Sequence, residues 1–229
     1  MALLAVDRLA VHMPTLRGAI SLVREVSFSI ERGETLGIVG ESGCGKTMTA
    51  LALMSLLPDG AIPSGEIRFE GENLLAMPED RLCALRGNRL AMIFQEPMSA
   101  LNPVHTVGRQ LSEVFLLHRT QDKAEALRLS VEMLRKVGIP SPEIRVGEYP
   151  HQLSGGMRQR VVIAMALACK PAVVIADEPT TALDVTIQAQ ILELMKDLQR
   201  EYHMAIILIT HNIGVVAEMA DDVVVMYAG

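Results

Sequence analysis

A glycine-rich segment, GESGCGKT at residues 40–47, constrains this chain more than any other feature. It matches the pattern G-x-x-x-x-G-K-[ST], in which backbone N–H groups surround phosphates, the lysine reaches the β- and γ-phosphates, and the hydroxyl binds Mg²⁺. An apolar run at residues 35–39 precedes the segment and a helical pattern follows it, which is the context that the motif requires. The alternative is an ordinary flexible turn between a strand and a helix. The candidate phosphate-binding residues are Gly40, Glu41, Ser42, Gly43, Cys44, Gly45, Lys46 and Thr47.

Two acidic residues, Asp177 and Glu178, follow a short apolar run at residues 173–176. In an α/β sheet, ligands bind at the carboxyl ends of parallel strands. Asp177 is therefore placed to hold Mg²⁺ opposite Thr47, and Glu178 to polarise an attacking water. An isolated acidic pair is more typical of a strand that ends in a solvated turn. Together with the phosphate loop, however, it predicts a metal site.

Strand-like and helical patterns alternate along the chain, which predicts an α/β fold with a parallel sheet. The expected strands are residues 3–12, 22–30, 35–39, 65–69, 173–176, 205–210 and 223–226. The expected helices are residues 46–57, 122–137, 185–202 and 213–220. A helical, proline-punctuated stretch at about 97–158 interrupts this alternation and predicts an α-helical insert.

The composition narrows the class of protein. Half of the 229 residues are apolar and 21% are charged, which excludes a disordered chain. The net charge of −6 and the 3% of aromatic residues argue against a nucleic-acid-binding surface. The cysteines, Cys44, Cys83 and Cys169, form no C-x-x-C pair and indicate free thiols rather than a zinc site. Cys44 is either a reactive thiol beside Lys46 or a small residue tolerated in the loop.

A third motif, LSGGM at residues 153–157, lies between the phosphate loop and the acidic pair. Alone it reads as the start of a helix, with Ser154 as the N-cap. In this order the three motifs resemble those of the ATP-binding subunits of ABC transporters, whose signature is LSGGQ; Met157 stands in place of the glutamine. The resemblance covers essentially the whole chain. It implies a single ABC ATPase domain over residues 1–229, with a P-loop NTPase core, an N-terminal antiparallel β subdomain and the α-helical insert.

The same resemblance assigns roles to individual residues. Gln95 matches the Q-loop glutamine, residues 182–184 match the D-loop, and His211 matches the switch histidine. The implied catalytic residues are Glu178, His211 and Gln95, and the implied Mg²⁺ ligands are Thr47, Gln95 and Asp177. Ser154, Gly155 and Gly156 are expected to act on the ATP bound by a second copy, with Asp184 at the contact between the two copies.

Further segments narrow the resemblance to one branch. Residues 92–97, 99–103, 149–152 and 184–190 look like those of the oligopeptide, dipeptide, glutathione and nickel importer ATPases. This implies a subunit that hydrolyses ATP to power import of peptides or related small solutes. The implied partners are a second ATPase chain, two transmembrane permease subunits and an external solute-binding protein, with no nucleic acid. The implied location is peripheral, on the cytoplasmic face of a prokaryotic inner membrane.

Two departures from the branch stand out. No aromatic residue precedes Ser27 to stack on adenine, which leaves His12, Met13 or Arg17 as candidates. The C-terminal extension usual in the branch is expected to be absent after Gly229. A different class, a non-transport ABC ATPase acting on nucleic acid or the ribosome, stays open as the alternative. A plain P-loop kinase would leave LSGGM and His211 unexplained.

Overall fold

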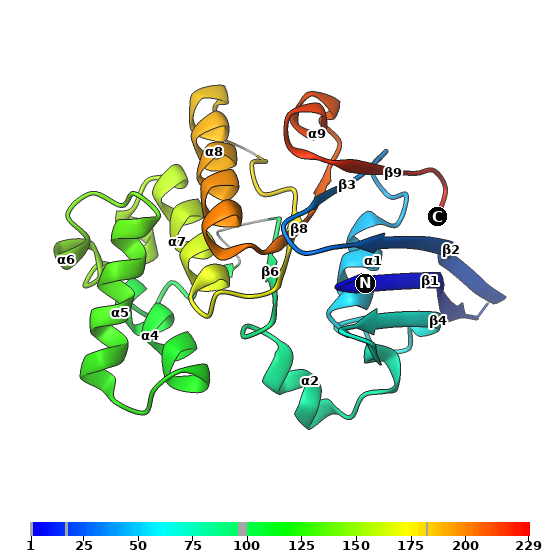
Figure 1. Ribbon diagram of the computed structural model, residues 1–229, viewed down its shortest axis with the longest axis horizontal. Coiled ribbons are helices and arrows are strands. Elements are labelled where there is room, and N and C mark those ends of the chain that lie inside the picture. The colour runs from blue at the N-terminus through cyan, green and yellow to red at the C-terminus, as the bar shows by residue number, and fades with distance from the viewer. Residues whose placement is uncertain (1, 17, 96–99, 182) are drawn as a thin grey trace.

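The computed structural model describes residues 2–16, 18–95, 100–181 and 183–229, and it forms two sheets and a group of helices (Figure 1). The strands are β1 (Leu4–Thr15), β2 (Gly18–Ile30), β3 (Thr35–Gly40), β4 (Ile62–Phe69), β5 (Glu72–Asn73), β6 (Leu90–Ile93), β7 (Val173–Asp177), β8 (Ala205–Thr210) and β9 (Asp222–Met226). The α-helices are α1 (Lys46–Leu53), α2 (Glu79–Leu85), α4 (Val107–His118), α5 (Lys123–Lys136), α6 (Pro142–Arg145), α7 (Gly155–Leu167), α8 (Val185–Tyr202) and α9 (Ile213–Met219).

The parallel sheet has the strand order β6-β7-β8-β3-β9. Strands β7 and β8 are buried along their whole length, as expected of a parallel sheet covered on both faces. Alternate side chains therefore enter two different cores. Val174 and Ile206 pack with the helices α4, α5, α7, α8 and α9, whereas Val173 and Ile207 pack with α1 and the N-terminal strands.

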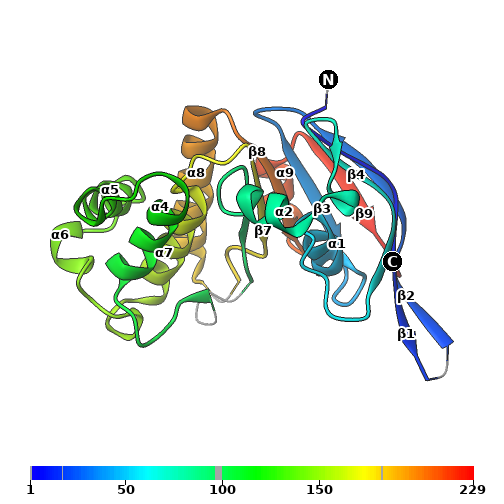
Figure 2. The same cartoon turned by 90° about the horizontal axis from the view of Figure 1, so that it is seen from below.

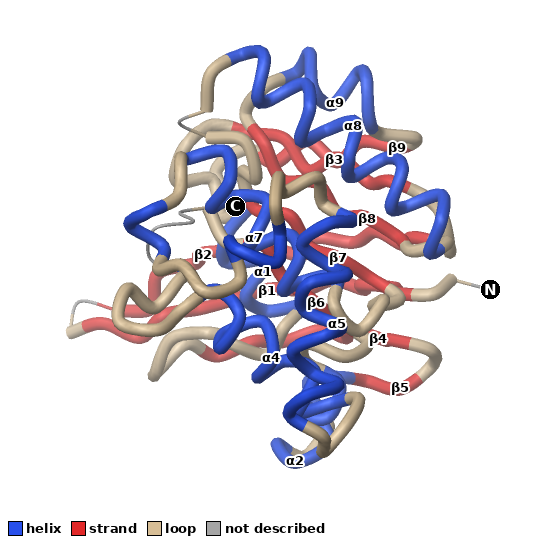
Figure 3. Tube along the Cα trace, turned by 90° about the vertical axis from the view of Figure 1, so that its left-hand side faces the viewer, coloured by secondary structure: helices blue, strands red, loops and turns tan. Residues whose placement is uncertain are grey.

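The N-terminal strands form an antiparallel sheet with the order β2-β1-β4-β5. Helix α1 packs between this sheet and the parallel sheet, and the hairpin of β1 and β2 extends beyond the rest of the fold (Figure 2). Seen from the left-hand side of Figure 1, the helices α4, α5 and α7 lie in front of the strands (Figure 3). Among the described residues, none of the helices combines the length and the apolar composition of a membrane span.

The predicted α/β class is confirmed, and the N-terminal antiparallel sheet and the helices between β6 and β7 are present as expected. The expected helix at residues 46–57 is wrong at its end. Helix α1 stops at Leu53 because Met54 caps it and Ser55 adopts a left-handed backbone with φ of 51°. Helix α2 and strand β6 were not expected from the sequence. Residues 96–99, at the start of the expected insert, lie outside the described residues.

Candidate functional site

The phosphate loop joins the carboxyl end of β3 to the start of α1. Gly45 is the N-cap of α1, with φ of 101°, and a Cβ there would lie 2.5 Å from the carbonyl oxygen of Leu22. Only glycine fits both conditions. The first N–H groups of a helix have no acceptor within the helix, so the amides that open α1 are available to an anion.

Lys46 folds back across this loop. Its Nζ donates to the carbonyl oxygens of Gly40 at 2.8 Å and Glu41 at 2.9 Å, and the residue is only 7% exposed. These bonds hold the ammonium group at the loop. Cys44 is buried, and its Sγ lies 3.9 Å from Lys46 Nζ and packs against Gly40.

Asp177 is the last residue of β7 and is 2% exposed. Burial raises the pKa of its carboxyl above the ordinary value, and a hydrogen bond from Thr47 opposes this only in part. Thr47 is the second residue of α1 and Asp177 the last of β7, so the two oxygen-bearing side chains expected to hold Mg²⁺ lie near each other.

Glu178 occupies an unusual backbone conformation, with φ of 48°. A non-glycine residue held there costs on the order of 1–3 kcal/mol, and its amide is anchored by a 2.9 Å bond to the carbonyl oxygen of Ile209. Its carboxylate accepts from Thr181 Oγ1 at 2.7 Å and from Gln95 Nε2 at 3.3 Å, and it lies 3.1 Å from His211 Nδ1. The structure therefore brings Gln95, Glu178 and His211 together from three separate segments.

The Glu178 carboxylate is 14% exposed, and its ionisation state follows from these contacts. Burial opposes ionisation, but the hydrogen bonds from Thr181 and His211 outweigh it and leave the pKa of Glu178 below its ordinary value. A carboxylate ionised in this way is able to accept a proton from water. Thr181 was not singled out from the sequence; only its position three residues after Glu178 could have indicated a turn.

A cavity of about 430 Å³ lies over the phosphate loop. Lys46, Thr47, Gln95 and Glu178 all line it. Strand β2 supplies the opposite wall through Ile20, Ser21 and Leu22, none of which was expected from the sequence.

The residues expected to contact adenine are His12, Met13 and Arg17. His12 and Met13 are not among the described residues that line the cavity. Met13 does pair with Ile20, which lines it, across strands β1 and β2. Arg17 lies outside the described residues. The sequence did not predict the pairing of Met13 with Ile20, because the sequence does not give the register of the hairpin.

The signature segment lies apart from this cavity. Ser154 is the N-cap of α7 and accepts from the Met157 amide at 3.3 Å, so the predicted N-cap is confirmed. Ser154 and Gly155 are exposed, and a Cβ on Gly155 would meet no atom within 4 Å among the residues that the structure describes. Gly156, in contrast, packs closely against Ile187. Neither Ser154 nor Gly155 is part of the described cavity wall.

A second helix, α8, begins close to the signature segment, and Asp184 lies at its start. It is the N-cap of α8 and accepts from the Ile187 amide at 2.9 Å. Ala182, in the expected D-loop, lies outside the described residues.

The chain is similar to known proteins along most of its length. The family model described as ABC transporter matches residues 23–181. The oligopeptide transport ATP-binding protein OppD of Bacillus subtilis is 55% identical over 229 residues, covering 99% of this chain and 64% of that protein. The dipeptide transport ATP-binding protein DppD of the same organism is 53% identical, covering 99% and 68%. The chain thus spans about two thirds of the length of these relatives.

Among solved structures, the chain resembles a dimeric post-hydrolysis state of the ATP-binding cassette MJ0796 bound to ADP and Pi. The TM-score is 0.87 at 26% identity, and the match covers 99% of this chain and 95% of that one. The cassette cbiO1 from Clostridium perfringens gives a TM-score of 0.81 at 28% identity, covering 100% and 86%.

Proposed function

The chain belongs to the ABC transporter family, and we propose that it binds and hydrolyses ATP to power import of peptides or related small solutes across a membrane. One observation carries the ATPase part of this proposal. Lys46, the first residue of a helix, lines the same cavity as Glu178, whose carboxylate is ionised and whose backbone is left-handed. A site that holds phosphates beside a general base suits hydrolysis of a phosphoanhydride bond.

Each residue then has a distinct task. Lys46 and the opening amides of α1 bind the phosphates, while Glu178 accepts a proton from the attacking water. His211 and Gln95 hold the Glu178 carboxylate from either side. Thr47, Asp177 and Gln95 offer the oxygen ligands that Mg²⁺ prefers. When bound, Mg²⁺ would neutralise charge on the phosphate oxygens.

The exposed signature segment supports action between two chains. Ser154 and Gly155 begin a helix whose free amides suit an anion, yet they are not in the described wall of the cavity of their own chain. A twofold dimer would place each signature segment, with Asp184 nearby, over the ATP of the other chain. The dimeric structure of the cassette MJ0796 is consistent with this arrangement.

An apolar cavity of about 360 Å³ supports contact with membrane subunits. It is lined by residues from β6, α4 and α7, and its rim carries the exposed side chains of Phe94 and Leu117. Phe94 directly precedes Gln95, which bonds to Glu178. A permease segment seated in this cavity would therefore lie one residue from the catalytic site. We place the chain peripherally on the cytoplasmic face of a prokaryotic inner membrane, with a solute-binding protein on the other side.

The choice of transported solute rests on the relatives, whose names specify oligopeptide and dipeptide transport. The rival class, an ABC ATPase that acts on nucleic acid or the ribosome, finds no support in these relatives. The net charge of −6 also argues against it.

The test has two parts. Phosphate release from Mg-ATP is measured for the wild-type chain and for Lys46→Ala, which should lose nucleotide binding because the phosphates lose their main cation. The chain is then isolated from membranes of its native host, and co-purifying permeases are identified. Absence of ATPase activity would overturn the enzymatic part. Recovery with ribosomes or nucleic acid in place of permeases would overturn the transport part.

A further inference from the structure

The side chain of Gln159 connects the signature helix to the turn that carries Glu178. Gln159 lies on α7, five residues after Ser154, and is 1% exposed. Its Nε2 donates to the carbonyl oxygen of Pro179 at 2.5 Å. Pro179 is itself buried and directly follows Glu178. The buried side-chain amide of Gln159 thus donates to the backbone directly after Glu178, the residue with the left-handed backbone.

The turn that receives this bond is held from other directions as well. The Glu178 amide bonds to Ile209 on β8, and the Thr181 amide bonds back to the Glu178 carbonyl oxygen at 3.1 Å. The bond from Gln159 ties this turn to α7. Because a left-handed backbone at Glu178 persists only where its surroundings hold it, the Pro179 bond bears directly on where the carboxylate points.

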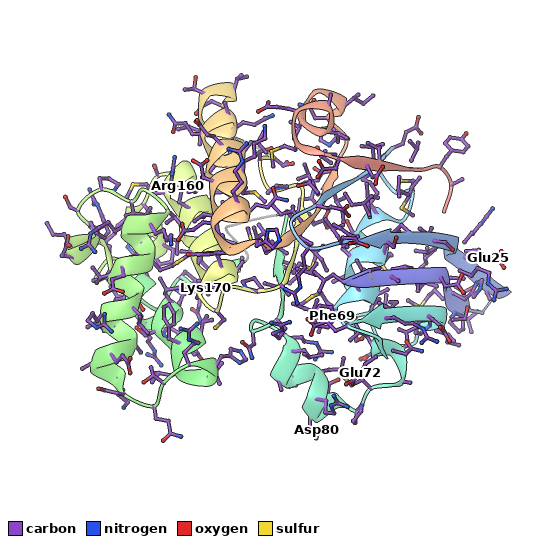
Figure 4. All side chains as sticks on the ribbon, in the orientation of Figure 1. Glu25, Phe69, Glu72, Asp80, Arg160 and Lys170 are labelled. Carbon is purple, nitrogen blue, oxygen red and sulfur yellow. The ribbon has the colours of Figure 1, made fainter. Side chains whose placement is uncertain are left out.

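The next residue of α7 points elsewhere. Arg160 donates from Nη1 to the carbonyl oxygen of Val137 at 2.6 Å, at the end of α5, and is labelled in Figure 4 beside the helices of the insert. Consecutive residues of α7 therefore hold the helical insert and the catalytic turn. The exposed helix start at Ser154 lies about 7.5 Å along the axis from Gln159, at about 1.5 Å per residue.

We propose that Gln159 is a positioning residue: it transmits the position of the signature helix, set by the nucleotide bound by the partner chain, to the Glu178 carboxylate. The proposal rests on the proposed function, in which Glu178 is the general base and the signature acts between chains. When a nucleotide draws the start of α7 toward it, the bond to Pro179 moves or fixes the Glu178 turn. Hydrolysis thereby becomes sensitive to whether the second chain is in place.

The test removes the donor while keeping the volume. Gln159→Met should lower kcat for ATP by about 10- to 100-fold, the scale expected when a catalytic group is displaced by a fraction of an ångström to 1 Å. The affinity for Mg-ATP should stay within about twofold, since Lys46 and Thr47 line the described nucleotide cavity and Gln159 does not. If Gln159→Met does not fold, Gln159→Asn replaces it with the same expectation, because its amide is one methylene too short.

A matched control comes from the same fold. Gln199 on α8 is also a buried glutamine that donates to backbone, here the carbonyl oxygen of Gly33 at 3.0 Å, and it does not line the described nucleotide cavity. Gln199→Met should lose thermal stability but keep kcat within about twofold. A purely structural role for Gln159 predicts equal kcat in the two variants, and that result would overturn the proposal. So would a loss of Mg-ATP affinity parallel to the loss of kcat.

The proposed function is judged separately from this inference. Wild-type hydrolysis that disappears in Glu178→Gln supports the proposed function whatever Gln159→Met does. If the wild-type chain hydrolyses no ATP, the proposed function fails and the role of Gln159 fails with it.

Discussion

The phosphate loop and the signature segment are both glycine-rich helix starts, yet their surroundings differ. At the phosphate loop, a Cβ on Gly45 would collide with Leu22, and Lys46 is bound to two carbonyl oxygens of its own chain. At the signature segment, Gly155 has open space around it and Ser154 is exposed. The first region is shaped by its own chain, whereas the second presents its amides outward, which suits a ligand that another chain holds.

The largest expected effect concerns the enclosed region. Glu178→Gln should leave ATP binding intact and lower hydrolysis by about 10²- to 10⁴-fold, because the general base is lost while the phosphate contacts remain. Phosphate release and ATP affinity measure the two effects separately. Glu193→Gln, an exposed change on α8, is the control. Turnover like that of the wild type would remove Glu178 from the catalytic role.

The next effect concerns the open region. Gly155→Asp should leave ATP binding by single chains unchanged and weaken ATP-dependent dimerisation by on the order of 100-fold, because the new carboxylate faces the γ-phosphate bound by the partner. Sedimentation with and without Mg-ATP measures the dimer. Loss of ATP binding by the monomer would show that the signature belongs to the site of its own chain.

Mixing two variants sharpens this comparison. A dimer of one Lys46→Ala chain and one Gly155→Asp chain carries both defects in one composite site and leaves the other site intact. The mixture should therefore regain activity that neither variant shows alone. If each chain used its own signature, the mixture would stay inactive.

A smaller effect separates the two glycine-rich segments by stability. Gly45→Ala should reduce the free energy of unfolding by about 1–3 kcal/mol, because φ of 101° and the approach of Leu22 both exclude a side chain. Gly155→Ala should change it by less than about 1 kcal/mol, because a Cβ there meets nothing in the described structure. Urea denaturation of both variants measures the difference. Equal losses would mean that the signature segment is as constrained as the phosphate loop.

Much of this could be predicted from the sequence because the relevant signals are local. The phosphate loop and the acidic pair are short segments, and the local backbone geometry sets the spacing of their residues. This holds for the glycines at 43 and 45, the lysine that follows, and the acids at the end of an apolar run. Helix α1 ended earlier than Pro58 suggested because Ser55 turns left-handed, which a pattern of apolar residues does not encode.

The remaining features depend on tertiary packing. Gln159 and Thr181 look like ordinary polar residues until α7 and the Glu178 turn are placed beside each other. Likewise, Ile20 and Leu22 enter the wall of the cavity only because β2 pairs with β1 and passes over the phosphate loop. The spacing of residues along the sequence does not predict these tertiary contacts.

The smallest expected effect uses the cysteines to probe how closed the phosphate loop is. Cys83 is exposed, whereas Cys44 and Cys169 are 5% and 6% exposed. Burial also raises the pKa of Cys169, so its reactive thiolate forms only at more alkaline pH.

A thiol-alkylating reagent at neutral pH should therefore modify Cys83 first, by a margin on the order of tenfold, and Cys169 should gain reactivity as the pH rises. The sequence left two readings of Cys44 open, a reactive thiol beside Lys46 and a small residue tolerated in the loop. Its packing under Gly40 predicts slow modification, slower still with Mg-ATP. Mass mapping of the labelled sites gives the order, and Cys44→Ser should keep ATPase activity because the thiol only fills space. Modification of Cys44 as fast as Cys83 would mean that the phosphate loop opens readily, and the contrast between an enclosed loop and an open signature segment would then fail.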